Sequence, residues 1–207
     1  SSQIEIEGVK QLKDVSYNVM PDRIEAGTLL CAVAITGGEI TLKKVNASHI
    51  TPVLNKLAEA GCTIKLRENE ITLKAPKKLK AVDIKTMPYP GFPTDMQAIM
   101  GATLTVATGT SIIVENIFES RYKYMIELQK MGAKINIEGK TAIIKGVKKL
   151  YGAKVQATDL RGGASLVLAG LVAKGTTNVE NIEYILRGYE NLDGKLKNLG
   201  AEIYMIK

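Results

Sequence analysis

One pattern runs three times through this chain of 207 residues. In each copy a helix-length apolar run begins at an aspartate and ends at a glycine, after which β-branched residues predict a strand. The aspartates are Asp22, Asp95 and Asp159, and the glycines are Gly38, Gly109 and Gly175. Glycine just past the end of a helix commonly has positive φ. The repeat length of about 70 residues is too long for a solenoid and fits one β-α-β-α-β-β unit.

The second half of each copy repeats as well. A second helix ends in a leucine that is followed four residues later by a glycine, and the next residues start a strand. These shared tails are 57–61, 128–132 and 196–200. Copies one and two then add a strand at 71–74 and 142–145, which copy three lacks before Lys207. We therefore expect the sheet of copy three to be completed by residues 3–8 or by a strand from outside this chain.

The repeats predict a single α/β domain over residues 1–207, built from three pseudo-symmetric β-α-β-α-β-β units. The units span about 15–80, 81–150 and 151–207, and residues 1–14 form a strand and a linker. With 45% hydrophobic residues, the chain can bury a large core. No segment resembles a signal peptide or an apolar span of roughly 20 residues. We expect a soluble, cytoplasmic protein with no membrane partner.

The formal net charge of +7 does not indicate a nucleic-acid partner, because most basic residues are scattered lysines without an arginine-rich run. Only five of the 28 basic residues are arginines. A guanidinium matters where a phosphate or carboxylate is held by two parallel hydrogen bonds, so we expect arginines at an anion site. Cys31 and Cys62 lack metal-ligand spacing and indicate buried thiols, and His49 indicates a surface or capping residue. No metal or cofactor is expected.

Three of the arginines stand at related positions. Arg121 and Arg187 both follow the middle strand of their copies, just before the second helix. Arg161 lies in the first turn of a helix, where free N–H groups and the helix dipole favour an anion. Copy one has Ser48-His49 instead of an arginine before its second helix. This asymmetry predicts one active edge formed by copies two and three, with copy one mainly structural.

Two helix starts carry a Thr-Asp pair. The pairs are Thr94-Asp95 and Thr158-Asp159. One interpretation is helix capping, as expected for Asp22 in a capping box with Glu25. Another is that both carboxylates also face a ligand at a common edge, where a carboxylate can take a hydroxyl proton and arginines can hold an anion. Unrelated surface salt bridges are a third. The proline-rich segment 89–93 is expected to fix the direction of Asp95.

Four segments carry a resemblance to a known family. They are 88–98 (Pro-Tyr-Pro-Gly-Phe-Pro-Thr-Asp-Met-Gln-Ala), 115–121 (Glu-Asn-Ile-Phe-Glu-Ser-Arg), 157–161 (Ala-Thr-Asp-Leu-Arg) and 187–190 (Arg-Gly-Tyr-Glu). With them the chain resembles the C-terminal domain of the UDP-N-acetylglucosamine 1-carboxyvinyltransferases, the enolpyruvyl transferases of peptidoglycan synthesis. The resemblance implies an inside-out α/β barrel. It also implies transfer of the enolpyruvyl group of phosphoenolpyruvate to the sugar 3-hydroxyl, with release of phosphate and without a cofactor.

The resemblance further implies roles for single residues. Asp95 would deprotonate the sugar hydroxyl, and Asp159 would assist proton transfer at the enolpyruvyl methylene. The substrate-binding residues that it implies are Thr94, Asp95, Ile117, Phe118, Arg121, Arg161 and Arg187. Among these, the arginines would hold the phosphate and carboxylate of phosphoenolpyruvate, and the backbone at 117–118 would contact the uridine nucleotide.

The chain departs from the family pattern at Ile99, Leu186 and Ser120, which weakens the support around the charged residues without changing them. The family's active-site lysine, its mobile-loop cysteine and most nucleotide contacts belong to an N-terminal domain. This chain alone is therefore expected to be an inactive, excised fragment that can form a non-native homodimer. Two alternatives are the related transferase for shikimate 3-phosphate, whose motifs match poorly, and a non-catalytic anion-binding or assembly module on the same fold.

Overall fold

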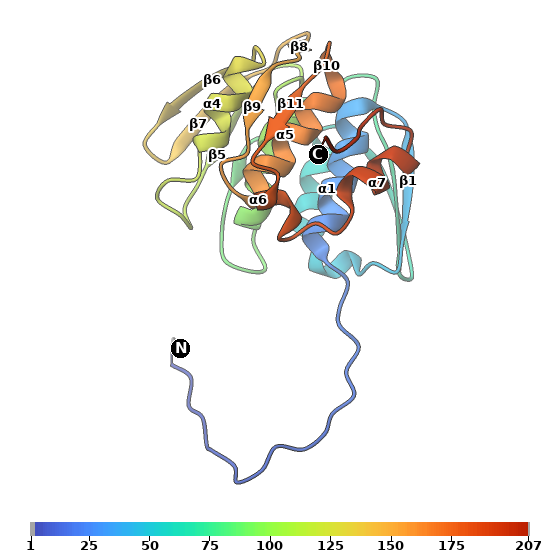
Figure 1. Ribbon diagram of the computed structural model, residues 1–207, viewed down its shortest axis with the longest axis vertical. Coiled ribbons are helices and arrows are strands. Elements are labelled where there is room, and N and C mark those ends of the chain that lie inside the picture. Colours follow the sequence, from blue (N-terminus) through green and yellow to red (C-terminus); the bar gives the residue numbers. More distant parts are fainter. Residues whose placement is uncertain (1–2, 207) are drawn as a thin grey trace.

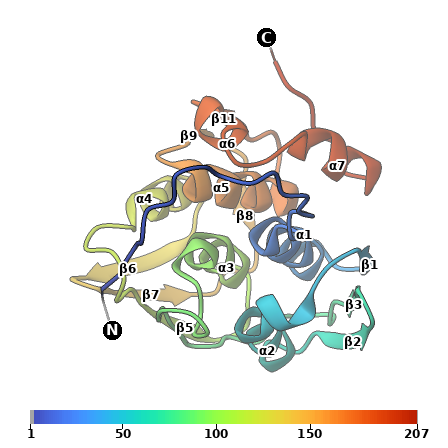
Figure 2. The same ribbon diagram turned by 90° about the horizontal axis from the view of Figure 1, so that it is seen from below.

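Three helices pack side by side at the centre of the molecule. The computed structural model describes residues 3–206. The central helices are α1 (Arg23–Thr36), α3 (Gln97–Leu104) and α5 (Leu160–Val172), and each contacts the other two (Figures 1 and 2). Beyond the charged residues in the first turns of α1 and α5, their sequences are mostly apolar or small, and all eight residues of α3 are buried. Helices that are hydrophobic all round are expected to lie inside a core.

Two antiparallel hairpin-based sheets lie outside these helices. The first has the order β1-β3-β2, and the second has the order β4-β5-β7-β6 with β4 parallel to β5. Their bounds are β1 (Glu39–Lys43), β2 (Thr63–Arg67), β3 (Glu70–Lys74), β4 (Ile84–Lys85), β5 (Thr110–Val114), β6 (Lys134–Glu138) and β7 (Thr141–Lys145). The strands predicted at 71–74 and 142–145 are therefore confirmed as β3 and β7.

Four helices lie outside the central three. Of these, α2 (Thr51–Glu59) and α4 (Lys123–Lys130) connect strands, while α6 (Glu183–Leu186) and α7 (Leu192–Asn198) follow β11. There are also short 3₁₀ turns, η1 (Ala47–His49) and η2 (Thr94–Met96). Helices α2 and α4 are amphipathic, because their buried residues recur every three to four positions. Figure 2 shows α2, α4 and α7 on the outside of the central trio.

The third segment differs from the first two. Its strands are short and form only parallel pairs, β8 with β10 and β9 with β11. Their bounds are β8 (Leu150–Tyr151), β9 (Lys154–Gln156), β10 (Ala173–Lys174) and β11 (Asn178–Glu180). The strand predicted after Gly200 is wrong for this chain, since residues 201–206 form none. A strand needs a hydrogen-bonding partner, and no described residue supplies one there.

The N-terminal segment also differs from its prediction. Residues 3–20 are exposed, contain no strand and run away from the body of the molecule (Figure 1). The strand expected within 1–14 is not formed in the described part of that range, and residues 3–8 do not complete the third sheet. Completion by a strand from outside this chain stays a prediction. In the part of the chain that the structure describes, no helix is long and apolar enough to cross a bilayer.

The positive φ predicted for the glycines of the repeat is confirmed. It is +96° at Gly38, +112° at Gly109 and +90° at Gly175. The three glycines in the second tails have φ between +91° and +104°. The predicted helix ends are wrong, however, because α1, α3 and α5 already end at Thr36, Leu104 and Val172. Side chains with a Cβ rarely adopt this backbone conformation, so glycine is favoured in the turns beyond the helix ends.

The remaining local predictions are largely confirmed. Asp22 caps α1, accepting hydrogen bonds from the backbone N–H of residues 24 and 25, while Glu25 pairs with Lys195 instead of completing a capping box. Cys31 and Cys62 are buried free thiols, and burial raises their pKa to about 12 and about 11. Thiols held in this state are poor nucleophiles. His49 ends the 3₁₀ turn η1, half-buried.

Candidate active site

A single carboxylate lies between two arginines at the start of α3. Arg121 donates from Nη2 to Oδ1 of Asp95 at 2.8 Å, and Arg161 donates from Nη2 to Oδ2 at 3.4 Å. The aspartate comes from η2, while the arginines come from the turn before α4 and from the first turn of α5. The structure therefore brings three of the predicted site residues together from separate segments.

The environment keeps Asp95 ionised. Burial raises the pKa of this half-buried carboxyl, but the hydrogen bonds and charges of Arg121 and Arg161 outweigh burial and hold the pKa below the usual value. A carboxylate at neutral pH can accept a proton. The two guanidinium groups also leave a net positive charge beside it, which favours an anionic ligand.

The Arg161 guanidinium is buried and has hydrogen-bond donors without a partner among residues 3–206. The residue is only 8% exposed, its guanidinium stacks on the Tyr189 ring at 5.1 Å, and its Nε and Nη1 have no hydrogen-bond partner among residues 3–206. The Tyr189 hydroxyl in turn lies 2.8 Å from that of Thr28 in α1. The sequence predicted that copy one is mainly structural, and the structure shows that its helix α1 also supports the site, because Thr28 helps to hold the Tyr189 ring against Arg161. Buried, unpaired donors of a cation are suited to an incoming anion.

The Thr94 hydroxyl links Arg121 to a buried glutamate. It accepts a hydrogen bond from Arg121 Nη1 at 2.7 Å and donates to Glu115 Oε2 at 2.9 Å. The ring of Phe118 covers the Arg121 guanidinium at 4.8 Å. Four predicted site residues, Thr94, Asp95, Phe118 and Arg121, thus form one connected group.

Asp159 has a different surrounding from Asp95. Its Oδ1 accepts from the backbone N–H of Arg161 at 3.0 Å and of Gly162 at 2.8 Å, so it caps α5. The Thr158 hydroxyl lies 3.2 Å from its Oδ2. The capping interpretation is therefore confirmed for Asp159 but not for Asp95, which accepts only from side chains.

Two predicted groups are present but not bound into this network. Arg187 directly follows α6 and is exposed. Its guanidinium stacks on the Tyr184 ring at 5.3 Å, and its side chain makes no hydrogen bond or ion pair with a described residue. Ile117 is also exposed, in the turn after β5. Its backbone N–H and that of Phe118 donate to Glu115. No residue within 3–206 donates a hydrogen bond to the carbonyl oxygen of either residue.

Sequence reasoning missed the residues that support the site. Glu115 lay in a quoted motif without a role, and Thr28, Thr86 and Tyr189 were not singled out. The sequence offers one signal for Glu115, which is a charged residue directly after the predicted strand 111–114. The aromatic and hydroxyl partners carry no spacing signal.

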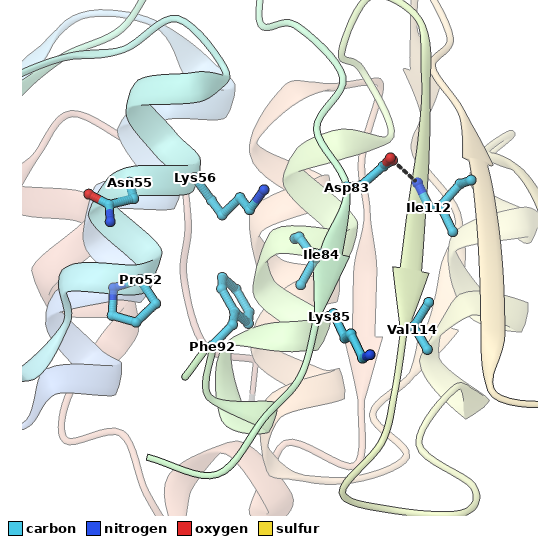
Figure 3. A pocket seen from close by; sticks show the side chains of 9 residues that line it. All are labelled: Pro52, Asn55, Lys56, Asp83, Ile84, Lys85, Phe92, Ile112 and Val114. Atoms are coloured by element: carbon cyan, nitrogen blue, oxygen red, sulfur yellow. Dashed lines mark hydrogen bonds between the residues drawn. The ribbon is translucent and has the colours of Figure 1, made fainter. Parts of the chain in front are cut away.

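A cavity of about 480 Å³ lies elsewhere on the molecule. Its lining includes Lys56 of α2, Asp83 just before β4, Lys85 of β4 and Val114 of β5 (Figure 3). Phe92, two residues before Thr94, also lines it. None of the predicted site residues lines this cavity.

Comparison with known proteins gives a consistent result. The family model of EPSP synthase (3-phosphoshikimate 1-carboxyvinyltransferase) matches residues 1–196. The chain is 52% identical to UDP-N-acetylglucosamine 1-carboxyvinyltransferase of Desulfofundulus thermocisternus, over 97% of this chain and 83% of that protein. It is 53% identical to UDP-N-acetylglucosamine 1-carboxyvinyltransferase 1 of Caldanaerobacter subterraneus subsp. tengcongensis, over 97% of this chain and 48% of that protein. The chain thus spans about half the length of several relatives that it matches.

Solved structures agree at the level of the fold. The enolpyruvyl transferase NikO from Streptomyces tendae superposes with a TM-score of 0.80 at 27% identity, covering 90% of this chain and 44% of that one. EPSP synthase from Acinetobacter baumannii gives a TM-score of 0.62 at 20% identity, covering 84% of this chain and 44% of that one. The latter likeness supports the α/β fold alone.

Proposed function

The chain belongs to the EPSP synthase family and within it to the UDP-N-acetylglucosamine 1-carboxyvinyltransferases, and from this premise we propose that it supplies one domain of such an enzyme. The complete enzyme would move the enolpyruvyl group of phosphoenolpyruvate to the 3-hydroxyl of UDP-N-acetylglucosamine and release phosphate, in the cytoplasmic stage of peptidoglycan synthesis. The observation that carries the proposal is the ionised Asp95 between Arg121 and Arg161.

The residues of this chain have different roles in the proposed reaction. Asp95 takes the proton of the sugar 3-hydroxyl as that oxygen bonds to C2 of phosphoenolpyruvate, whose methylene carbon gains a proton. The tetrahedral intermediate then loses phosphate and a methyl proton, which restores the double bond. Asp159, at the start of α5, assists the proton transfers at this carbon. The arginines hold the phosphate and carboxylate, and their fixed charges stabilise the intermediate.

Anion binding is coupled to the basicity of Asp95. Arg121 and Arg161 lower the pKa of this carboxyl in the free chain. When the phosphate or carboxylate of phosphoenolpyruvate takes up their donors, less positive charge is left for Asp95, and its pKa rises. A carboxylate with a higher pKa is a stronger general base. The base is thereby strengthened when the second substrate is in place.

The nucleotide is assigned to the turn after β5. The free carbonyl groups of Ile117 and Phe118 accept hydrogen bonds, so they suit the hydroxyl and N–H donors of a uridine group. Arg187, which stacks only on Tyr184, is free to turn toward the phosphoenolpyruvate anion. The relatives at 52–53% identity favour this substrate over shikimate 3-phosphate.

A companion domain is part of the proposal. Apolar side chains alternate with polar ones at residues 4–6 and 15–19, and Ile4, Ile6, Val15 and Val19 are each at least 84% exposed. Such alternation is typical of strands. In the complete enzyme we assign this segment to the sheet of the N-terminal domain and the last strand of the third repeat to chain outside residues 1–207, which gives two inside-out barrels of three repeats. In this chain alone, the exposed apolar segment favours a non-native homodimer.

Phosphate release tests the function directly. This chain alone should give no release from phosphoenolpyruvate and UDP-N-acetylglucosamine, and the complete two-domain enzyme should release phosphate only when both are present. Release with shikimate 3-phosphate in place of the nucleotide sugar would overturn the substrate assignment. Anion binding without turnover in the complete enzyme would instead support the non-catalytic module.

A further inference from the structure

Among residues 3–206, Glu115 is the charged side chain with the most hydrogen bonds outside the roles already assigned. It directly follows β5 and is only 1% exposed. Its Oε1 accepts from the Thr86 hydroxyl at 2.7 Å and from the backbone N–H of Ile117 at 2.8 Å and of Phe118 at 3.2 Å. Its Oε2 accepts from Thr94 at 2.9 Å. A buried carboxylate is tolerated only with such a set of donors.

These bonds join three separate segments. Thr86 follows β4, Thr94 begins η2, and residues 117 and 118 form the turn assigned to the nucleotide. Thr86 is tied into the same turn from its other side, because its hydroxyl accepts from the backbone N–H of Asn116 at 2.8 Å. A capping role alone would need only the two N–H bonds of the turn, so the bonds to Thr86 and Thr94 require a further explanation.

The carboxylate fixes the direction of every hydroxyl around it. The Thr94 hydroxyl donates its single proton to Glu115 Oε2. The lone pairs of the Thr94 oxygen then face Arg121, whose Nη1 donates to them at 2.7 Å. With Nη1 held there, Nη2 lies 2.8 Å from Oδ1 of Asp95. One chain of oriented bonds thus runs from the turn at 117–118 to the proposed base.

We infer that Glu115 is a positioning residue, which couples occupancy of the 117–118 turn to the placement of Arg121 and Asp95 through the Thr94 hydroxyl. The inference rests on the proposed function for the identity of the ligands at both ends. A nucleotide bound at the carbonyl groups of the turn fixes the two N–H groups that hold Glu115, and Glu115 holds Thr94. The sugar hydroxyl therefore meets a base that is already aligned by the other end of the same substrate.

The informative variant is Glu115→Gln, which keeps the shape of the side chain. Its amide oxygen can still accept from Thr86 and from the two N–H groups of the turn. Its NH₂ group, however, faces the Thr94 hydroxyl, which must turn its proton away and so loses alignment with Arg121. Glu119→Gln is the matched control, because Glu119 is an exposed carboxylate of the same turn.

Titration of the Asp95 carboxyl by ¹³C NMR in this chain tests the coupling without any reaction. The wild-type pKa should lie below 3.8. The pKa of Asp95 should rise in Glu115→Gln and also in Thr94→Val, because Thr94 is the next link in the same chain of bonds. It should stay unchanged in Glu119→Gln. If both variants keep the wild-type titration while their amide spectra remain native-like, the inference is overturned.

Kinetics of the complete enzyme provide the second readout. Glu115→Gln should lower kcat about 10- to 100-fold, the scale expected for a displaced catalytic group. The double variant Thr94→Val/Glu115→Gln should fall no more than about threefold below the worse single variant, since both remove one pathway. Additive losses would mean that Glu115 acts without Thr94 and would contradict the inference. If the wild type releases no phosphate, the proposed function fails, while the titration still decides the coupling.

Discussion

The same dipeptide, Thr-Asp, performs two different tasks in this molecule. At 158–159 the aspartate caps α5, and its Oδ1 is occupied by two backbone N–H groups. At 94–95 a 3₁₀ turn precedes α3 and no side chain caps it, so the Asp95 carboxylate is left for Arg121 and Arg161. The geometry of a helix start therefore decides whether its aspartate is used for structure or is available for chemistry.

A parallel difference separates Arg121 from Arg187. Arg121 finds two acceptors, Thr94 and Asp95, because the second segment carries a complete four-stranded sheet with a rigid turn after β5. Arg187 follows the two-residue and three-residue strands of the third segment and has no acceptor among the described residues. Equivalent positions in a repeat thus predict the residue type but not the environment.

The largest effect is expected when each of these two arginines is replaced by lysine, because only Arg121 should then lose two acceptors. Arg121→Lys removes the planar fork that reaches both acceptors, and we expect kcat of the complete enzyme to fall about 10- to 100-fold. Arg187→Lys has no such fork to lose and should mainly raise KM for phosphoenolpyruvate. Steady-state kinetics of both variants provide the measurement. Equal losses of kcat would contradict the different roles of the two arginines.

The capping role of Asp159 should be visible in the thermal stability of the chain. Asp159→Ala removes the cap of α5 and should cost about 1 kcal/mol of unfolding free energy. For a chain of this size the melting temperature should fall by roughly 2–4 °C. Asp159→Asn should retain most of the stability, because asparagine caps as well as aspartate. Thermal unfolding of the two variants checks this, and equal melting temperatures would remove the capping role.

Acid unfolding should reveal the smaller contribution of Asp95. Its folded-state pKa is lowered, so the stabilisation is present above the unfolded value of 3.8 and is lost as pH falls through the folded pKa. Wild type should exceed Asp95→Asn at neutral pH by no more than about 1 kcal/mol, as for other partly exposed ion pairs. The difference should shrink as pH falls below 3.8 and vanish below the folded-state pKa. Denaturant unfolding over a series of pH values from 7 into acid is the measurement, and a difference that does not change with pH would contradict the ion-pair explanation.

The sequence predicted much of the fold because its strongest signals are local. Each apolar run contains one helix, and the positive φ predicted at Gly38, Gly109 and Gly175 is observed, although the helices end before these glycines. The prediction of a strand after Gly200 is wrong for a non-local reason. Its prediction assumed a partner, and strand formation depends on a partner that this part of the sequence does not contain.

The site was predictable only in part. The scarcity of arginine pointed to Arg121 and Arg161, which the structure brings to Asp95. The supporting Glu115 and Tyr189 could not be found in this way, because their contribution consists of contacts between segments far apart in the chain. Which Thr-Asp pair caps its helix was also hidden, since it depends on the 3₁₀ turn at 94–96.

The central claim is that Asp95, not Asp159, is the main base, and one side-by-side measurement tests it. In the complete enzyme, kcat for phosphate release would be measured for Asp95→Asn and Asp159→Asn. Loss of a general base costs about 10²- to 10⁴-fold, so we predict that Asp95→Asn falls in this range and lies at least about tenfold below Asp159→Asn. A loss in Asp159→Asn that equals or exceeds the loss in Asp95→Asn would contradict the account.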